Sequence, residues 1–184
     1  GNKEAQKALA EAVASPSVPA SVKQDAVISL GLTESPSAEA KASLKTQSGQ
    51  TGELGTSATL ALGNMAHQLG KEGQSASDIV DDLLARLGAA TTSDQKVALL
   101  DALGNAGDDR ALPALKASLG DPDASVRAAA TSALRFLKTA EADGLLVAAA
   151  SSPELTTRRA AVFAMAQRDV MAVFAGLEHL VKED

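Results

Sequence analysis

The feature that most constrains this chain is that it repeats itself. The segment DQKVALLDALG (94–104) is followed 31 residues later by SVRAAATSALR (125–135), and a third copy begins at residue 156. Two earlier copies begin at residues 21 and 53, so successive copies are 32, 41, 31 and 31 residues apart. Repeats of this size, each burying an apolar face against its neighbours, are typical of solenoid proteins.

Each copy is predicted to be an α-helix that lies close to the next copy. The first position of each copy is expected to lie at the N-cap, because four of its five residues are of types whose side-chain oxygen commonly accepts a free backbone N–H there: Ser21, Glu53, Asp94, Ser125 and Thr156. A later position holds only small residues, which allow close helix packing: Ser29, Ala61, Ala102, Ala133 and Ala164. The next position holds the large apolar anchors Leu30, Leu62, Leu103, Leu134 and Met165.

A second helical pattern precedes the later copies, over residues 79–87, 111–119 and 142–150. Short turn signals rich in Pro, Gly, Ser and Asp separate the paired helices. The chain has three Phe and no Trp or Tyr, which disfavours a β-sandwich or barrel and favours helices built from small and aliphatic residues. The predicted fold class is therefore all-α: a right-handed α-α superhelix of about five helix pairs.

One unit, residues 108–137, carries a specific pattern. Pro113 lies in the predicted first turn of its first helix, Asp121-Pro122 marks the turn, and Val126-Arg127 opens the second helix. This pattern resembles the HEAT-type repeat, which implies a solenoid over the whole chain. We expect a single repeat domain over residues 1–184, a fragment of a longer protein, with an additional C-terminal helix at 170–181. The expected repeats span approximately 3–32, 36–69, 76–106, 108–138 and 141–168.

The repeat pattern also predicts local details. Asp123 and Glu154 stand four residues before Arg127 and Arg158, the separation for an ion pair at the start of a helix. The ten extra residues of the 41-residue step are assigned to the polar stretch at 70–78. Residues 35–57 fit the pattern poorly, so that repeat is expected to be irregular.

A second resemblance covers residues 60–115, where Leu62-Gly63-Asn64 and Leu103-Gly104-Asn105 each end a repeat. These residues are similar to the helical N-terminal superhelix of large lipid transfer proteins, the vitellogenin group. The resemblance implies, as an alternative function, a helical domain of a lipid-transfer-like protein. It implies no lipid site in this chain, because the β-sheets that bind lipid in that family are absent from the sequence.

The sequence holds no pattern that predicts catalysis. His67 and His179 are the only histidines, and no cysteine is present to complete a metal site. Neither histidine precedes a Glu, as the iron-binding histidines of HEAT-like hydroxylases do. The Gly-rich stretch around Gly49 and Gly52 lacks a phosphate-binding lysine motif. We expect no cofactor and no enzyme activity, with a HEAT-like lyase or hydroxylase as the enzymatic alternative.

Charge is distributed unevenly along the chain. The net charge of −6 argues against nucleic acid as a partner. Residues 71–123 carry a net charge of −5, whereas residues 124–168 carry +3. The second helices of a solenoid commonly line its binding surface, so the predicted partner-binding face comprises Lys96, Arg127, Arg135, Arg158 and Arg159. The alternative interpretation is a solvated face with Asp–Arg pairs between repeats.

These observations predict a non-catalytic interaction or scaffold module. The expected partner is another protein, or another domain of the same parent chain, with an acidic surface. No apolar run approaches the roughly 18 residues of a membrane span. The sequence shows no targeting signal, and it leaves the compartment and the oligomeric state open.

Overall fold

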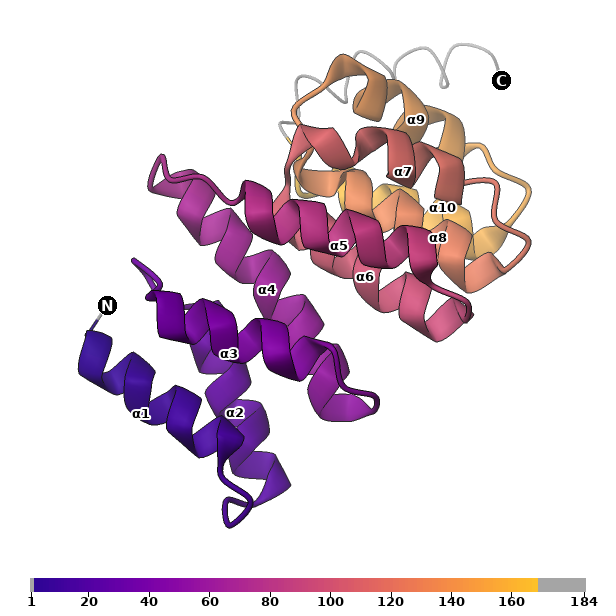
Figure 1. Ribbon diagram of the computed structural model, residues 1–184. Coiled ribbons are helices and arrows are strands. Elements are labelled where there is room, and N and C mark those ends of the chain that lie inside the picture. The colour runs from indigo at the N-terminus through magenta and orange to yellow at the C-terminus, as the bar shows by residue number, and fades with distance from the viewer. Residues whose placement is uncertain (1, 169–184) are drawn as a thin grey trace. The chain divides into compact units, whose positions relative to one another are not determined.

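The structure is a computed structural model that describes residues 2–168, and every regular element in that part of the chain is helical (Figure 1). The prediction of an all-α fold is confirmed. The predicted C-terminal helix at 170–181 lies outside the described residues. No helix within residues 2–168 has the length and apolar character needed to cross a membrane.

The chain divides into two compact units, and the boundary falls between Ala85 and Arg86. The prediction of a single domain over residues 1–184 therefore stays a prediction. The first unit contains four complete helices and the beginning of a fifth: α1 (Lys3–Ala14), α2 (Ala20–Gly31), α3 (Ala38–Ser48), α4 (Glu53–Lys71) and α5 (Ser77–Ala89). Within it α2 packs against α4, and α1 packs against both α2 and α3.

The second unit contains the end of α5 and the remaining described elements. They are α6 (Ser93–Ala106), the 3₁₀ helix η1 (Asp109–Ala111), α7 (Leu112–Ser118), α8 (Ala124–Ala133), the 3₁₀ helix η2 (Leu134–Phe136), α9 (Ala140–Ala150) and α10 (Leu155–Met165). The second helices of successive repeats lie side by side, α6 against α8 and α8 against α10. Pro113 lies in the first turn of α7, as predicted, where its missing N–H removes no helical hydrogen bond.

The second helices begin one or two residues earlier than predicted. The five positions expected to be N-caps lie inside the first turns, and the caps are Pro19, Gly52, Thr92, Asp123 and Glu154. Thr92 and Asp123 each accept a backbone N–H through the side chain. The correction has a physical reason, because these two oxygens satisfy donors that the helix itself leaves free.

Small residues set the distance between the second helices. A Cβ on Gly31 of α2 would lie 2.7 Å from the Cα of Ala61, and a Cβ on Gly104 of α6 would lie 2.6 Å from the Cα of Ala133. Ala133 and Ala130 are fully buried, as are the anchors Leu30, Leu62, Leu103 and Leu134. The predicted close packing is confirmed at Ala133, since neither backbone leaves room for a larger side chain.

The 41-residue step is absorbed differently from the prediction. Helix α4 has 19 residues and continues to Lys71, so the assignment of the extra residues to a polar loop at 70–78 is wrong for its first part. The added turns are held by an apolar stripe that the loop assignment overlooked: Met65, Ala66 and Leu69 are all buried. These side chains recur at helical spacing after Leu62, which is why the helix continues.

Candidate functional site

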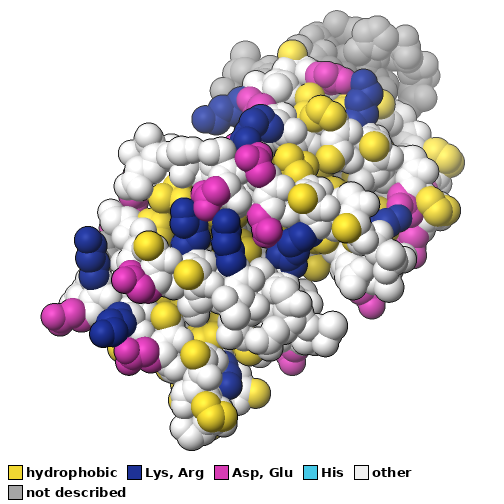
Figure 2. Space-filling view, in the orientation of Figure 1, with side chains coloured by type: hydrophobic (Ala, Val, Ile, Leu, Met, Phe, Trp, Pro, Cys, Tyr) yellow, Lys and Arg dark blue, Asp and Glu magenta, His cyan; other side chains and the backbone are white. Residues whose placement is uncertain are grey.

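The five basic residues of the predicted partner-binding face all lie in the second unit. Lys96 is on α6, Arg127 on α8, Arg135 in η2, and Arg158 and Arg159 on α10. In the space-filling view, Lys and Arg side chains are interspersed with Asp and Glu and with apolar patches (Figure 2). What each basic residue contacts therefore decides whether it can take part in binding.

Lys96 spans two repeats. Its Nζ lies 2.7 Å from Oδ2 of Asp121, in the turn before α8. The hydrogen bond from Lys96 holds the pKa of Asp121 below its usual value. The lysine thus connects α6 to the following repeat.

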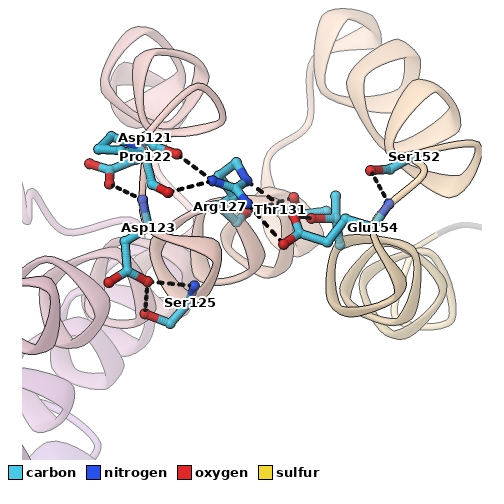
Figure 3. Close-up of polar contacts among 9 residues, drawn as sticks. Asp121, Pro122, Asp123, Ser125, Arg127, Thr131, Ser152 and Glu154 are labelled. Atoms are coloured by element: carbon cyan, nitrogen blue, oxygen red, sulfur yellow. Dashed lines mark hydrogen bonds and ion pairs between the residues drawn. The ribbon is translucent and has the colours of Figure 1, made fainter.

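Arg127 occupies the equivalent position one repeat later and makes the most contacts (Figure 3). Its Nη1 donates to the carbonyl oxygens of Asp121 (2.7 Å) and Pro122 (2.9 Å). Its Nε and Nη2 donate to the two carboxylate oxygens of Glu154, at 3.0 and 2.8 Å. Such a bidentate pair is the strong form of a charge-assisted hydrogen bond. Arg127 therefore closes its own turn and clamps the next one.

The Arg127–Glu154 pair is reflected in the ionisation of both groups. The hydrogen bond from Arg127 lowers the pKa of Glu154, and a hydrogen bond from the Thr157 hydroxyl at 2.9 Å lowers it further. The same carboxylate raises the pKa of Arg127 above its ordinary value. Both charges are thus stabilised across the α8–α10 contact.

The predicted ion pair between Asp123 and Arg127 is wrong. The carboxylate of Asp123 instead accepts the backbone N–H of Ser125 at 2.8 Å and the Ser93 hydroxyl at 2.5 Å. Hydrogen bonds from Ser125 and Ser93 lower the pKa of Asp123 to about 2. The Asp123 carboxylate is committed to capping α8, and Arg127 reaches forward to the next repeat. The companion pair, Glu154 with Arg158, is wrong for the same reason, since Glu154 binds Arg127.

Arg135 is half-buried and does not share the repeat position of Lys96 and Arg127. Its guanidinium donates to the carbonyl of Ser132 and to the side chain of Asn105 on α6, and it sits 5.1 Å from the centre of the Phe136 ring. Burial lowers the pKa of Arg135, and the charge of Asp101 offsets part of this effect. Burial likewise raises the pKa of Asp101. Arg135 therefore fills space between α6 and η2.

Arg158 holds the same repeat position on α10 that Arg127 holds on α8. Its Nη1 donates to the carbonyl of Ser152 at 2.7 Å, six residues earlier, as Nη1 of Arg127 does to Asp121. Its Nε and Nη2 have no partner within residues 2–168. The neighbouring Arg159 is exposed and makes no polar contact in this described part of the chain. The structure thus places Lys96, Arg127 and Arg158 in one row along α6, α8 and α10, and only its last member lacks a carboxylate partner within residues 2–168.

The sequence patterns missed two further groups of residues. Arg168 has a buried side chain that pairs with Asp143 at 2.7 Å and donates to the carbonyl of Leu134 at 2.6 Å. In the first unit, Lys41 and Lys45 both lie 3.0 Å from Oδ2 of Asp78. Burial raises the pKa of Asp78, but the hydrogen bonds from the two lysines outweigh this effect and lower it overall. Neither arrangement has a local sequence signal, since each joins residues 25 or more positions apart.

The sequence patterns also missed an apolar patch on α10. Three large side chains are more than half exposed there: Leu155 (58%), Val162 (62%) and Phe163 (57%). Alignment of the repeats predicts the opposite for Val162, because it falls in the column of Leu100 and Thr131, which are fully buried. Within residues 2–168, no group of three or more His, Asp or Glu side chains is arranged to hold a metal ion.

Comparison with known proteins shows what the chain is similar to. Residues 80–166 match the family described as HEAT repeats. No curated protein matches the chain. Among solved structures, the complex of CpcE and CpcF of phycocyanin lyase from Nostoc sp. PCC7120 matches with 18% sequence identity and a TM-score of 0.45, over 90% of this chain and 77% of that one. The comparisons give no support to the lipid-transfer alternative.

Proposed function

Because the chain is a HEAT-type helical repeat protein, we propose that it is a non-catalytic interaction module that binds an acidic surface through Arg158 and Arg159. The acidic surface belongs to another protein or to another domain of the same parent chain. The observation that carries the proposal is the difference in contacts along the basic row. Lys96 and Arg127 are joined to acidic side chains of the next repeat, whereas Arg158 keeps two donor groups and Arg159 is exposed.

This proposal narrows the predicted partner-binding face. Lys96, Arg127 and Arg135 hold neighbouring repeats together, so a partner would have to break internal contacts to reach them. Binding to Arg158 and Arg159 breaks no contact with another repeat of the described chain. Their planar guanidinium groups can each bind a carboxylate with two parallel hydrogen bonds. The two arginines adjoin the exposed Leu155 and Val162, which provide apolar area beside the charge.

The test is affinity capture from an extract of cells that produce the protein, using the full chain as bait. The Arg158→Glu, Arg159→Glu double variant should lose the captured partner. The matched control is Lys3→Glu with Lys71→Glu, which changes the net charge equally at exposed positions of the first unit. Captured protein should also fall as salt rises through the range that screens exposed charges. Partners retained by the arginine variant at every salt concentration would contradict the proposal.

A further inference from the structure

The outer face of α10 has the features that the outer faces of α6 and α8 use to receive another helix. Helix α8 packs on α6 and α10 packs on α8, but in the described part of the chain no second helix follows α10. In the column of Leu100, Thr131 and Val162, exposure is 0% for the first two and 62% for the third. Val162 therefore stands at a position whose side chain is fully buried in the two preceding repeats.

The charged column ends in the same way at the same place. Lys96 pairs with Asp121 in the turn that leads into α8. Arg127 pairs in the same way with Glu154, in the turn that leads into α10 (Figure 3). Arg158 donates through Nη1 to the carbonyl of Ser152, as Nη1 of Arg127 does to that of Asp121, but its Nε and Nη2 meet no carboxylate within residues 2–168. Leu155, Arg158 and Val162 share one face of α10, because they are three, four and seven residues apart.

We infer that this face of α10 docks a helix of another protein that carries a carboxylate at its N-cap and small residues along the side that meets α10. The inference rests on the proposed function and specifies the kind of acidic partner. The required pattern is the one that α10 itself presents to α8. Glu154 is its N-cap, and Thr157, Ala161 and Ala164 are the small residues among its buried positions. The docking surface continues a helix-to-helix contact that already exists in the molecule.

Charge complementarity selects this occupant over a second copy of the chain. In a head-to-tail pair, the exposed helix offered by the second copy would be α2, which has exposed apolar side chains at Val22, Ile28 and its C-cap residue Leu32. The N-cap of α2 is Pro19, and residues 15–19 include no acidic side chain. A second copy would thus cover Val162 but leave Arg158 without a carboxylate.

The test uses the full chain and a fluorescein-labelled peptide that copies residues 152–166, stapled between positions 159 and 163 to keep it helical. These positions are exposed on α10 and lie away from its buried side. Fluorescence anisotropy should show saturable binding. A peptide with Glu154→Gln should bind about tenfold more weakly, the loss of roughly 1.4 kcal/mol expected for one charged hydrogen-bonded contact.

Variants of the chain locate the site. Arg158→Gln should weaken the Glu154 peptide by the same factor of about ten and should not weaken the Glu154→Gln peptide further. Val162→Asp should abolish binding, whereas the matched control Val22→Asp, at an exposed valine of α2, should leave it unchanged. Circular dichroism of each variant checks that helicity is retained.

Three outcomes would overturn the inference. They are absence of binding, binding that ignores Val162→Asp, and binding that appears only in the variant Glu183→Gln with Asp184→Asn. The last outcome would assign Arg158 to the chain's own acidic residues, because Glu183 follows Arg158 by 25 positions, as Asp121 follows Lys96. If the peptide fails while the extract partner still requires Arg158 and Arg159, the proposed function stands and only the helical docking geometry is wrong.

Discussion

The α2–α4 contact of the first unit and the α6–α8 contact of the second unit share their packing and differ in their charges. In both, a glycine of one second helix faces an alanine of the next, Gly31 with Ala61 and Gly104 with Ala133. In the second unit a lysine adds an ion pair between the repeats, Lys96 with Asp121. In the first unit the polar link between α2 and the start of α4 is a hydrogen bond with one neutral partner, in which Gln24 donates to Glu53 at 3.2 Å.

The reason for the difference lies in the turn before α4. The position of α2 that corresponds to Lys96 and Arg127 is Lys23, but residues 49–52 of that turn include no acidic side chain. The turns before α8 and α10 supply Asp121 and Glu154. Close helix packing is therefore common to both units, whereas the charged row exists only where the turn supplies a carboxylate.

The largest effect is expected from removing the packing that both units share. Gly31→Ala and Gly104→Ala place a Cβ within 3 Å of backbone atoms, which cannot move aside. Each should cost about 1–3 kcal/mol of unfolding free energy. Urea titration followed by circular dichroism at 222 nm measures this loss.

Controls for these glycines are available in both units. Gly70 and Gly144 are helical, and a Cβ added at either position would meet no atom within 4 Å. Alanine there should stabilise by up to about 1 kcal/mol, because glycine is the poorer helix former. If one unit tolerates its interface alanine as well as its control, the two contacts are not equivalent.

The next effect separates the units by pH. Hydrogen bonds lower the pKa of Asp121, Asp123 and Glu154 in the second unit, and the first unit has only Asp78 in this condition among the described residues. A carboxyl whose folded pKa is lowered adds stability above its unfolded pKa of about 4, and that stability is lost as pH falls through the folded pKa. Acidification from pH 5 to 2 should therefore weaken the second unit more. Asp101 opposes this trend, because its raised pKa favours the folded state while the group is protonated.

Hydrogen exchange with mass spectrometry distinguishes the two units, and a variant tests the cause. Asp123→Asn keeps an oxygen for the Ser125 N–H but cannot titrate, so it should flatten the decline between pH 4 and about 2. Asp94→Asn, at an exposed carboxylate of the same unit, is the control. Equal acid sensitivity of both units would remove the distinction drawn from the carboxylates.

A smaller effect should follow from adding a charge to the first unit. Gln24→Arg places a cation beside Glu53 and imitates the lysine pair of the second unit. We expect stabilisation of less than about 1 kcal/mol, since Glu53 is exposed to solvent. Thermal melts at low and at 1 M salt measure it, and the gain should disappear at high salt. A gain that persists in salt would show packing rather than charge at work.

The smallest effect is expected at Arg159. Its side chain is exposed and contacts no other polar group within residues 2–168, so Arg159→Glu should leave the melting temperature unchanged. Arg168→Gln is the contrasting variant, because it removes hydrogen bonds to Asp143 and to the carbonyl of Leu134 and should lower the melting temperature clearly. A loss of stability at Arg159 would place that residue in the fold and outside the proposed binding surface.

The repeat spacing predicts the fold well, because the small and large apolar columns are periodic in the sequence. Ala133 and Leu134 are buried as their columns require. The partners of the basic residues were not predictable in the same way. Local spacing suggested Asp123 for Arg127, whereas the actual partner is Glu154, 27 residues away. Which of two acids an arginine reaches depends on the three-dimensional stacking of repeats, and the N-cap role of Asp123 removes it from competition.

The most direct test of the charged row is a double-mutant cycle at Arg127 and Glu154, with Arg158→Gln measured beside it. The unfolding free energies of Arg127→Gln, Glu154→Gln and the double variant are compared by urea titration. If the row joins successive repeats, the double variant should lose less stability than the two single losses added together. Arg158→Gln should destabilise less than Arg127→Gln, because Nε and Nη2 of Arg158 meet no carboxylate within residues 2–168. Additive losses in the cycle, or an Arg158 variant as unstable as the Arg127 variant, would contradict the account.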